Sequence, residues 1–242
     1  MGSGLVQCCN MIDLYFWPTP NGFKITIFCE EAGVPYNLVP VDIGAGDQFA
    51  PEFLAISPNN RMPAIVDPDG PGGEPLALFE SGAILLYLAE KHGRFLPVDE
   101  RRRLDVLQWL MWQMGGIGPM LGQNHHFRIY APEQLPYAVE RYTSEARRLY
   151  RVLDKRLEGR DFICQEYSIA DMAVFPWIMP YKRQGIVLEE YPNIRRWFDA
   201  LKVRPAVHKA IEAGRELRRE IADGMSEETR SILFGQKQFE KR

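Results

Sequence analysis

A proline at the head of a short apolar run and an acid–serine pair at the head of an amphipathic helix constrain this chain most. Pro63 opens the run 63–66, and Glu80–Ser81 lead into the apolar-periodic segment 81–91. Because Pro63 has no backbone N–H to donate to a sheet, it belongs at the start or the edge of a strand. The two motifs lie about 20 residues apart and predict a loop, a strand, a hairpin and a helix in that order.

The same two motifs predict a place where an extended peptide can lie. If the Met62–Pro63 bond is cis, the Met62 backbone turns outward and can pair with such a ligand. Ser81 is a good N-cap, and the free N–H groups and positive dipole end of its helix suit a carboxylate. Glu80 suits an ammonium, and a γ-glutamyl group carries both charges on one carbon. Each motif alone is more often an ordinary strand edge or helix cap.

The first part of the chain alternates strand and helix patterns. Thr19 can cap a helix that Gly33 ends, and Gly/Pro-rich residues join two later strands as a turn. The strand patterns cover 12–16, 36–41, 63–66 and 76–79, and the helix patterns cover 19–33, 51–56 and 81–91. This order predicts a thioredoxin-like α/β domain with a mixed sheet over residues 11–92.

Beyond Asp99 the pattern is helical throughout and predicts an all-helical domain over 99–222. The segment 101–114 is expected to bury Leu104, Leu107, Leu110, Met111 and Met114 on one face, and 115–119 is expected to break it. A long helix is predicted over 132–157, and 192–203 and 206–222 complete the bundle. Residues 1–10 are interpreted as an extension and 223–242 as a flexible tail.

The string Ser168-Ile169-Ala170-Asp171 has the S-x-x-D form of a capping box. It predicts the start of a buried helix. We therefore interpret Asp171 as a folding residue and not as a catalytic acid.

Composition excludes several functions. The 242 residues are 46% hydrophobic, which is enough for two domains with buried cores. A formal net charge of −3 gives no global basic field, which argues against nucleic acid as a partner. The apolar runs are too short to span a bilayer, and residues 1–10 do not resemble a secretory signal. We expect a cytoplasmic protein with no membrane partner.

The cysteines and histidines do not predict a metal site. The four cysteines, at positions 8, 9, 29 and 164, show neither metal nor Cys-x-x-Cys spacing, which fits a reduced compartment. Cys29 lies about three helical turns beyond Thr19, and we interpret it as a buried structural thiol. His125 and His126 have no carboxylate or cysteine at ligand spacing, so we expect one of them to pack in a loop that lines a cleft.

Four strings resemble those of the cytosolic glutathione transferases, and within them the nu-class and Ure2-like group. They are FWPTPNG at 16–22, SPNN at 57–60, FES at 79–81 and GQNHHF at 122–127. The resemblance covers about residues 11 to 222. It implies a thioredoxin-like N-terminal domain, an all-α C-terminal bundle and a homodimer. Trp17 stands where other members often have a smaller residue, which would narrow the pocket.

The resemblance also implies the chemistry and the cofactor. Thr19 and Asn21 stand where the family places its thiol-activating residue, and they would hold the sulfurs of two glutathiones, or of one glutathione disulfide, per subunit. A bound glutathione thiolate then attacks a substrate disulfide and a second one resolves the mixed disulfide, so no protein sulfur is needed. No metal is implied.

The resemblance further assigns the rest of the glutathione. Gln48 and Arg61 would lie near the glycyl carboxylate, and Met62, ahead of Pro63, would pair with the cysteinyl segment through its backbone. Glu80 and Ser81 would hold the γ-glutamyl end. Arg141 matches an arginine used for the second glutathione or the neighbouring subunit. Equally, Arg141 pairs with Glu145 at i,i+4 on a helix surface.

Three functions stay open on the sequence. The first is a glutathione-dependent disulfide-bond reductase with weak transferase activity. The second is a dedicated glutathione transferase, or a thioether-cleaving enzyme, acting on an electrophilic small molecule. The third is a non-catalytic Ure2-like binding or regulatory protein. The chain shows no Asn/Gln-rich arm, which argues against the third. The Thr19 and Asn21 pair favours disulfide chemistry over the second.

Overall fold

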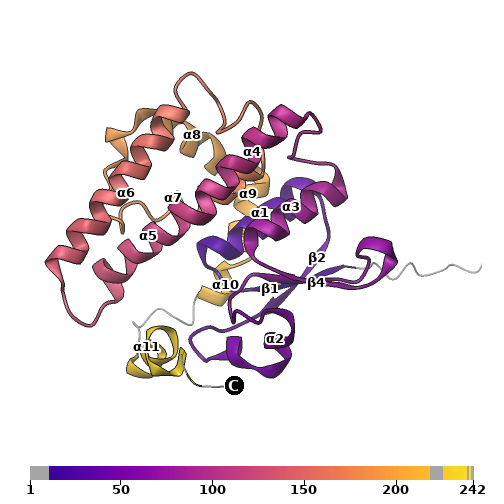
Figure 1. The fold of residues 1–242 in the computed structure, drawn as a ribbon, viewed down its shortest axis with the longest axis horizontal. Helices are drawn as coiled ribbons and strands as arrows, with labels where there is room; N and C mark the ends of the chain where they lie inside the picture. The colour runs from indigo at the N-terminus through magenta and orange to yellow at the C-terminus, as the bar shows by residue number, and fades with distance from the viewer. Residues whose placement is uncertain (1–10, 219–225, 239, 241–242) are drawn as a thin grey trace, which may run out of the picture.

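The structure is a computed structural model that describes residues 11–218, 226–238 and 240, and the predicted extension at 1–10 lies outside them. An α/β unit is followed by a helical unit, and helices α1 and α3 lie between the sheet and the helical unit (Figure 1). The α/β unit runs β1 (Ile12–Phe16), α1 (Pro20–Ala32), β2 (Tyr36–Pro40), α2 (Pro51–Ile56), β3 (Ala64–Asp67), β4 (Leu76–Phe79) and α3 (Ser81–His92).

The predicted mixed sheet is confirmed. Its strand order is β2-β1-β3-β4, with β1 parallel to β2 and antiparallel to β3, and with β3 antiparallel to β4. Helices α1 and α3 cover one face, and α2 covers the other, where Phe53 packs against Val41 and Ala64. The sheet therefore has a helix on each side, as in a thioredoxin-like fold.

Helix α1 has no free face along most of its length. Thr19 caps it at the N-terminus, as predicted, and Gly33 ends it with a φ of 70°, a conformation that glycine adopts without cost. Every residue from Gly22 to Cys29 is buried. The cause is packing on two sides, because α1 contacts the neighbouring α3 and also α7 and α9 of the helical unit.

The helical unit contains eight α-helices among the described residues, with two π-helical segments next to α5. The elements are α4 (Glu100–Trp112), η3 (Gln113–Ile117), α5 (Gly118–His125), η4 (His126–Tyr130), α6 (Pro136–Arg156), α7 (Ile169–Ile178), α8 (Pro192–Lys202), α9 (Pro205–Glu212), α10 (Arg215–Arg218) and α11 (Glu227–Phe234). Within the segments that the structure describes, no helix is long and apolar enough to cross a bilayer.

The predicted break at 115–119 is wrong. The chain continues through the π-helical turn η3 directly into α5, with helical backbone angles at the junction. Pro119 falls in the first turn of α5, where it needs no N–H donor, and Gly116 lies against Leu149 and Trp112. Packing on α6 therefore carries the helix through residues that would end it in isolation. It also places His125 and His126 on helical segments and not in the expected loop.

The predicted buried face of α4 is also wrong in part. Val106 and Leu110 are buried, whereas Leu104 and Met111 are 57% and 55% exposed. The helix is rotated so that Val106, Leu110 and the following Gln113 face the core, at helical spacing. Leu104 and Met111 thus form an exposed apolar stripe on the single chain.

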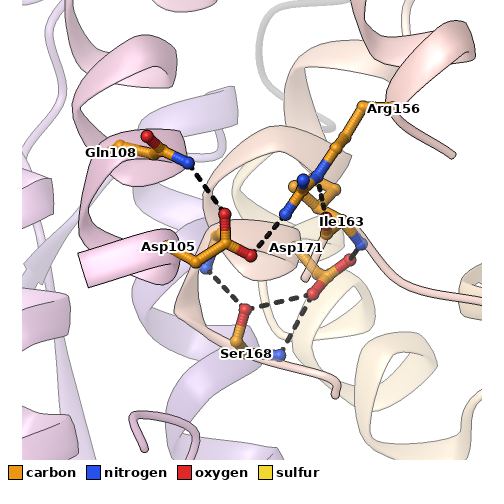
Figure 2. A network of polar contacts seen from close by, with 7 residues as sticks. Asp105, Gln108, Arg156, Ile163, Ser168 and Asp171 are labelled. Carbon is orange, nitrogen blue, oxygen red and sulfur yellow. Dashed lines mark hydrogen bonds and ion pairs between the residues drawn. The ribbon is translucent and has the colours of Figure 1, made fainter. Parts of the chain in front are cut away.

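The capping box at the start of α7 is confirmed, and it sits in a buried polar network (Figure 2). The Asp171 carboxylate accepts hydrogen bonds from the backbone N–H groups of Ile163 and Ser168 at 2.9 and 3.1 Å and from the Trp197 indole at 2.9 Å. Burial raises the pKa of Asp171 to about 6, and these donors oppose that rise. Asp171 is fully buried among these donors, so its role is to hold α7 against the loop before it and against α8.

The tail expected to be flexible contains a helix in its described part. Ser226 caps α11, and Ile232 is only 4% exposed. Phe234 packs against His126 and Tyr130 with ring centroids at 4.8 and 5.5 Å. These contacts pack the end of α11 against η4 of the helical unit, despite the polar composition of 226–238. Figure 1 shows α11 beside the α/β unit, on the side of α2.

Candidate active site

A cleft of about 2320 Å³ lies between the two units. Ligand pockets for one small molecule usually measure about 300–1,000 Å³, so this cleft has room for more than one such molecule. Seven of the nine residues predicted for the site line it, namely Thr19, Asn21, Arg61, Met62, Pro63, Glu80 and Ser81. The helical unit contributes the opposite wall, including His125, Phe175 and Trp177, and α11 adds residues at the mouth.

Thr19 lies where β1 gives way to α1. Its hydroxyl oxygen accepts from the Gly22 N–H at 3.3 Å and so caps the helix. Its hydrogen points to the Met62 sulfur at 3.8 Å, which is a weak acceptor. The hydroxyl can therefore donate to a better acceptor in the cleft, such as a thiolate, without giving up the cap.

Asn21 lies in the first turn of α1 and is oriented by the helical unit. Its amide oxygen accepts from the indole N–H of Trp177 at 3.0 Å. Because the oxygen is engaged, the NH₂ group is the end that remains to donate to a ligand. The hydrogen bond from Trp177 to Asn21 could not be read from the sequence, because the two residues are 156 positions apart.

The Met62–Pro63 peptide bond is cis, which is the condition on which the expected backbone pairing with an extended ligand depends. Pro63 is buried and precedes β3, whereas Arg61 is exposed on the cleft. The Arg61 carbonyl accepts from the Ser57 hydroxyl at 2.8 Å, which fixes the turn before β3. The Arg61 guanidinium has no ion pair within the described parts of the chain, so it can bind a ligand carboxylate.

The cap of α3 differs from the prediction. Glu80, and not Ser81, occupies the N-cap position, and Ser81 is the first helical residue. Glu80 has a φ of 70° and a ψ of 109°, an unfavourable conformation for a residue with a Cβ, of the kind that costs about 1–3 kcal/mol and gathers at functional sites. The Glu80 side chain caps nothing, so the first N–H groups of α3 stay available to an anion.

Sequence reasoning missed Lys24, which stands behind this pair. Lys24 is 0% exposed on α1, and its ammonium group donates to the Ser81 hydroxyl at 3.1 Å and to the Gln113 side-chain oxygen at 2.6 Å. Burial lowers the pKa of Lys24 to about 7, and the charge of Glu80 opposes this shift. The only sequence signal was a lysine inside the apolar run Phe23–Phe28.

Gln48 and Arg141 do not reach the cleft. The Gln48 side chain is buried and donates to the Ile43 carbonyl at 3.2 Å, so it braces the loop ahead of α2. The Arg141 side chain is 57% exposed on α6 and lies 4.0 Å from Glu145. This i,i+4 pair on the helix surface is the alternative role that the sequence predicted for Arg141. The places of Gln48 and Arg141 depend on tertiary packing, which the sequence motifs do not encode.

His125 lines the cleft as a neutral imidazole. Burial and the charge of Arg183 lower its pKa to about 4, and its Nε2 atom has no hydrogen-bond partner among the described residues. His126 instead packs on Phe127 and Phe234. Within the described ranges no three His, Cys, Asp or Glu side chains gather as a metal site.

The two described cysteines are poor nucleophiles. Cys29 is 1% exposed and Cys164 is 4% exposed, and burial raises the pKa of each thiol to about 12. Neither lines the cleft. Cys8 and Cys9 lie outside the residues that the structure describes. A thiolate at this site would therefore come from a ligand and not from Cys29 or Cys164.

Two family models match the chain. The model described as "Glutathione S-transferase, N-terminal domain" covers residues 11–90, and "Glutathione S-transferase, C-terminal domain" covers residues 136–200. Among known proteins, Disulfide-bond oxidoreductase YfcG of Escherichia coli (strain K12) is 59% identical over 203 residues, which are 83% of this chain and 94% of that protein.

Solved structures of similar proteins hold glutathione. A glutathione transferase from Burkholderia graminis, with two glutathione molecules per subunit, has a TM-score of 0.81 and 43% identity, covering 85% of this chain and 89% of that chain. A glutathione transferase from Pseudomonas putida, with one glutathione disulfide per subunit, has a TM-score of 0.81 and 44% identity, covering 86% of this chain and 94% of that chain.

Proposed function

This chain belongs to the glutathione S-transferase family, and we propose that it is a glutathione-dependent disulfide-bond reductase that uses the thiols of bound glutathione. The observation that carries the proposal is the pairing of two donors, Thr19 and Asn21, with a cleft large enough for two ligands of this size. The relatives with two glutathiones, with glutathione disulfide, and with the name disulfide-bond oxidoreductase support it.

The reaction needs two thiol–disulfide exchanges. One glutathione thiolate attacks a sulfur of the substrate disulfide, forms a mixed disulfide with it and expels a substrate thiolate. The second glutathione thiolate attacks the glutathione sulfur of that mixed disulfide, which releases the other substrate thiolate and leaves glutathione disulfide. The two protons lost by the glutathione thiols balance the two substrate thiolates.

The chain's own residues would raise the thiolate population. The Thr19 hydroxyl, the Asn21 amide and the N-terminal end of α1 all favour a negative sulfur beside them, through hydrogen bonds and the helix dipole. Arg61 would bind the glycyl carboxylate, the Met62 backbone would pair with the cysteinyl segment, and Glu80 with Ser81 would hold the γ-glutamyl end.

We also infer a homodimer in the cytoplasm. The exposed apolar pair Leu104 and Met111 on α4 supports a partner surface there. In such a dimer the solvent-facing Arg141 would act on the neighbouring subunit's glutathione. A cytoplasmic location supplies the reduced glutathione pool that the reaction consumes.

A transferase reaction is the second candidate, because the same cleft has an aromatic wall that includes Phe175, Trp177 and Tyr181. Such a wall suits an apolar electrophile. The test compares turnover of 2-hydroxyethyl disulfide with glutathione, coupled to glutathione reductase, with conjugation of chlorodinitrobenzene by the same preparation. Strong disulfide turnover with weak conjugation supports the reductase, and strong conjugation alone overturns it in favour of a dedicated transferase.

A further inference from the structure

Among the described residues, no carboxylate forms an ion pair or hydrogen bond with the buried amine of Lys24. Its three N–H donors have three neutral acceptors, the Ser81 hydroxyl at 3.1 Å, the Gln113 amide oxygen at 2.6 Å and the Met114 sulfur at 3.4 Å. Taking an ammonium group out of water costs several kcal/mol unless an opposite charge compensates it. A lysine kept in this place beside the cleft therefore either loses its proton or has its positive charge balanced by a ligand from outside the protein.

The contact with Ser81 sets the direction of the serine hydroxyl. Because Ser81 accepts from Lys24, its own hydrogen must point elsewhere, and it now lies toward the Met114 sulfur at 3.7 Å. Sulfur is a weak acceptor. The carboxylate of a ligand bound at the N-terminus of α3 would be a stronger acceptor than this sulfur. It would also place a negative charge beside Ser81, which itself contacts the Lys24 ammonium.

We propose that Lys24 positions Ser81 for the α-carboxylate of the γ-glutamyl group and supplies the buried positive charge that this carboxylate balances, so that ligand binding is coupled to proton uptake by Lys24. The inference rests on the proposed function, since it assumes that glutathione or a relative of it occupies the cleft. Lys24 acts through Ser81 and is a positioning residue, not a catalytic one.

The charges around Lys24 support the coupling. In the free protein, burial holds the pKa of Lys24 at about 7, so a neutral amine and an ammonium are both populated near neutrality. Glu80 is the charged group that acts on it within the described chain. Helices α7 and α9 also pack on α1, but their charged and titratable groups have other partners or places. Asp171 of α7 accepts from Trp197. On α9, Lys209 pairs with Glu30, Glu212 pairs with Arg215, and His208 lines the cleft.

Gln113 extends the arrangement to the helical unit. It lies in the π-helical segment η3, is fully buried, and gives its side-chain oxygen to Lys24. Its side-chain nitrogen has no partner within the described residues. Among the described residues, this side chain has a hydrogen bond only with Lys24. The Lys24 amine thus links Ser81, at the proposed γ-glutamyl end of the cleft, to Gln113 in the helical unit.

The test is calorimetric titration with S-methylglutathione, which has no thiol to ionise, near pH 7 in two buffers of different ionisation enthalpy. We expect the wild-type protein to take up a fraction of a proton on binding. Lys24→Met should abolish that uptake and raise the dissociation constant about tenfold or more, because a charge-assisted contact is lost. In turnover, the KM for glutathione should rise while kcat at saturating glutathione changes little.

Two further variants keep the test decisive. Lys209→Met removes an exposed lysine from a helix that also packs on α1, and it should behave as wild type. Gln113→Glu retains Lys24 but gives it a permanent negative partner, so it should lose proton uptake even if Lys24→Met fails to fold. Uptake and affinity within twofold of wild type in either Lys24→Met or Gln113→Glu would overturn the inference.

The outcomes separate this inference from the proposed function. If wild-type protein binds S-methylglutathione with proton uptake but does not reduce 2-hydroxyethyl disulfide, the function fails and the role of Lys24 stands. If it reduces the disulfide and Lys24→Met binds with unchanged uptake, only the role of Lys24 fails. If wild-type protein does not bind S-methylglutathione, both fail.

Discussion

The indole N–H of Trp177 donates a hydrogen bond to the side-chain oxygen of Asn21 over 3.0 Å. Trp177 lies near the end of α7 in the helical unit, and Asn21 lies in the first turn of α1. The bond fixes which end of the Asn21 amide faces the cleft. The helical unit therefore sets the chemistry of a residue that belongs to the α/β unit.

Trp177→Phe should lower disulfide turnover about tenfold. The ring would keep its packing but lose the N–H, and the Asn21 amide could then turn its oxygen toward the thiolate, which repels it. A stability loss of about 1 kcal/mol is expected for the missing bond. Steady-state kinetics and urea unfolding measure the two effects. A variant with unchanged kcat/KM would show that the orientation of Asn21 does not matter.

Thr19→Ala should reduce both stability and activity, whereas Thr19→Ser should retain most of both. Alanine loses the cap, which costs about 0.5–2 kcal/mol, and it loses the donor to the sulfur. The pKa of bound glutathione should rise, which the ultraviolet absorbance of the thiolate reports as a function of pH. If Thr19→Ala binds glutathione with an unchanged thiol pKa, Thr19 does not stabilise the thiolate.

Cys29→Ser should be nearly silent in turnover, because the wild-type thiol is buried with a pKa of about 12. The proposed reaction draws both sulfurs from glutathione. The measurement is disulfide turnover at matched folded fraction, since a buried serine can lower stability. A large loss of activity in a variant that remains folded would contradict the use of ligand thiols alone.

Asp171→Ala should cost about 3 kcal/mol or more of unfolding free energy, at about 1–3 kcal/mol for each buried donor left unsatisfied, without a specific effect on KM. The alanine would leave three buried N–H donors without their acceptor, on Ile163, Ser168 and Trp197. Ser168→Ala is the matched control, and with only its hydroxyl lost it should cost about 1 kcal/mol. Equal losses in the two variants would mean that the cap alone, and not the wider network, holds α7.

Lys24→Met should raise the free energy of unfolding relative to wild type, and this gain should be larger at about pH 7 than at about pH 10. The folded protein holds the pKa of Lys24 near 7, below its usual value, so between these pH values the unfolded chain binds more protons than the folded one. Wild-type stability from this group therefore rises with pH across that window, and the methionine variant lacks the rise. Urea unfolding at the two pH values checks the sign.

Local signals in the sequence were enough for most of the fold. The Thr19 cap, the Gly33 stop and the Ser168–Asp171 box each act within one helical turn, so the elements they bound could be predicted. The start of β3 after Pro63 was predictable for the same reason, but the cis bond was only a condition of the argument, because most X–Pro bonds in folded proteins are trans. The helical run through 115–119 was not, because packing on α6 overrides the glycines there.

The candidate site was only partly predictable. Its lining motifs are contiguous in the sequence, and seven of the nine predicted residues face the cleft. Glu80 occupies the N-cap position that was expected for Ser81. This could not be predicted, because the positive φ of Glu80 is imposed by the surrounding fold and does not follow from its residue type. Lys24 was missed, since a lysine in a helix is normally solvated, and its burial results from contacts with Gln113, 89 residues away.

Helix α1 belongs to the hydrophobic cores of both units, with every residue from Gly22 to Cys29 buried. A fragment that stops at the linker after α3 would expose the side of α1 that α7 and α9 cover, and would aggregate before it could bind anything. The two units should therefore melt in a single calorimetric transition, and limited proteolysis should yield no stable half. The boundary between the two units describes the order of elements along the chain, and it is not a place where this protein can be cut into two folded parts.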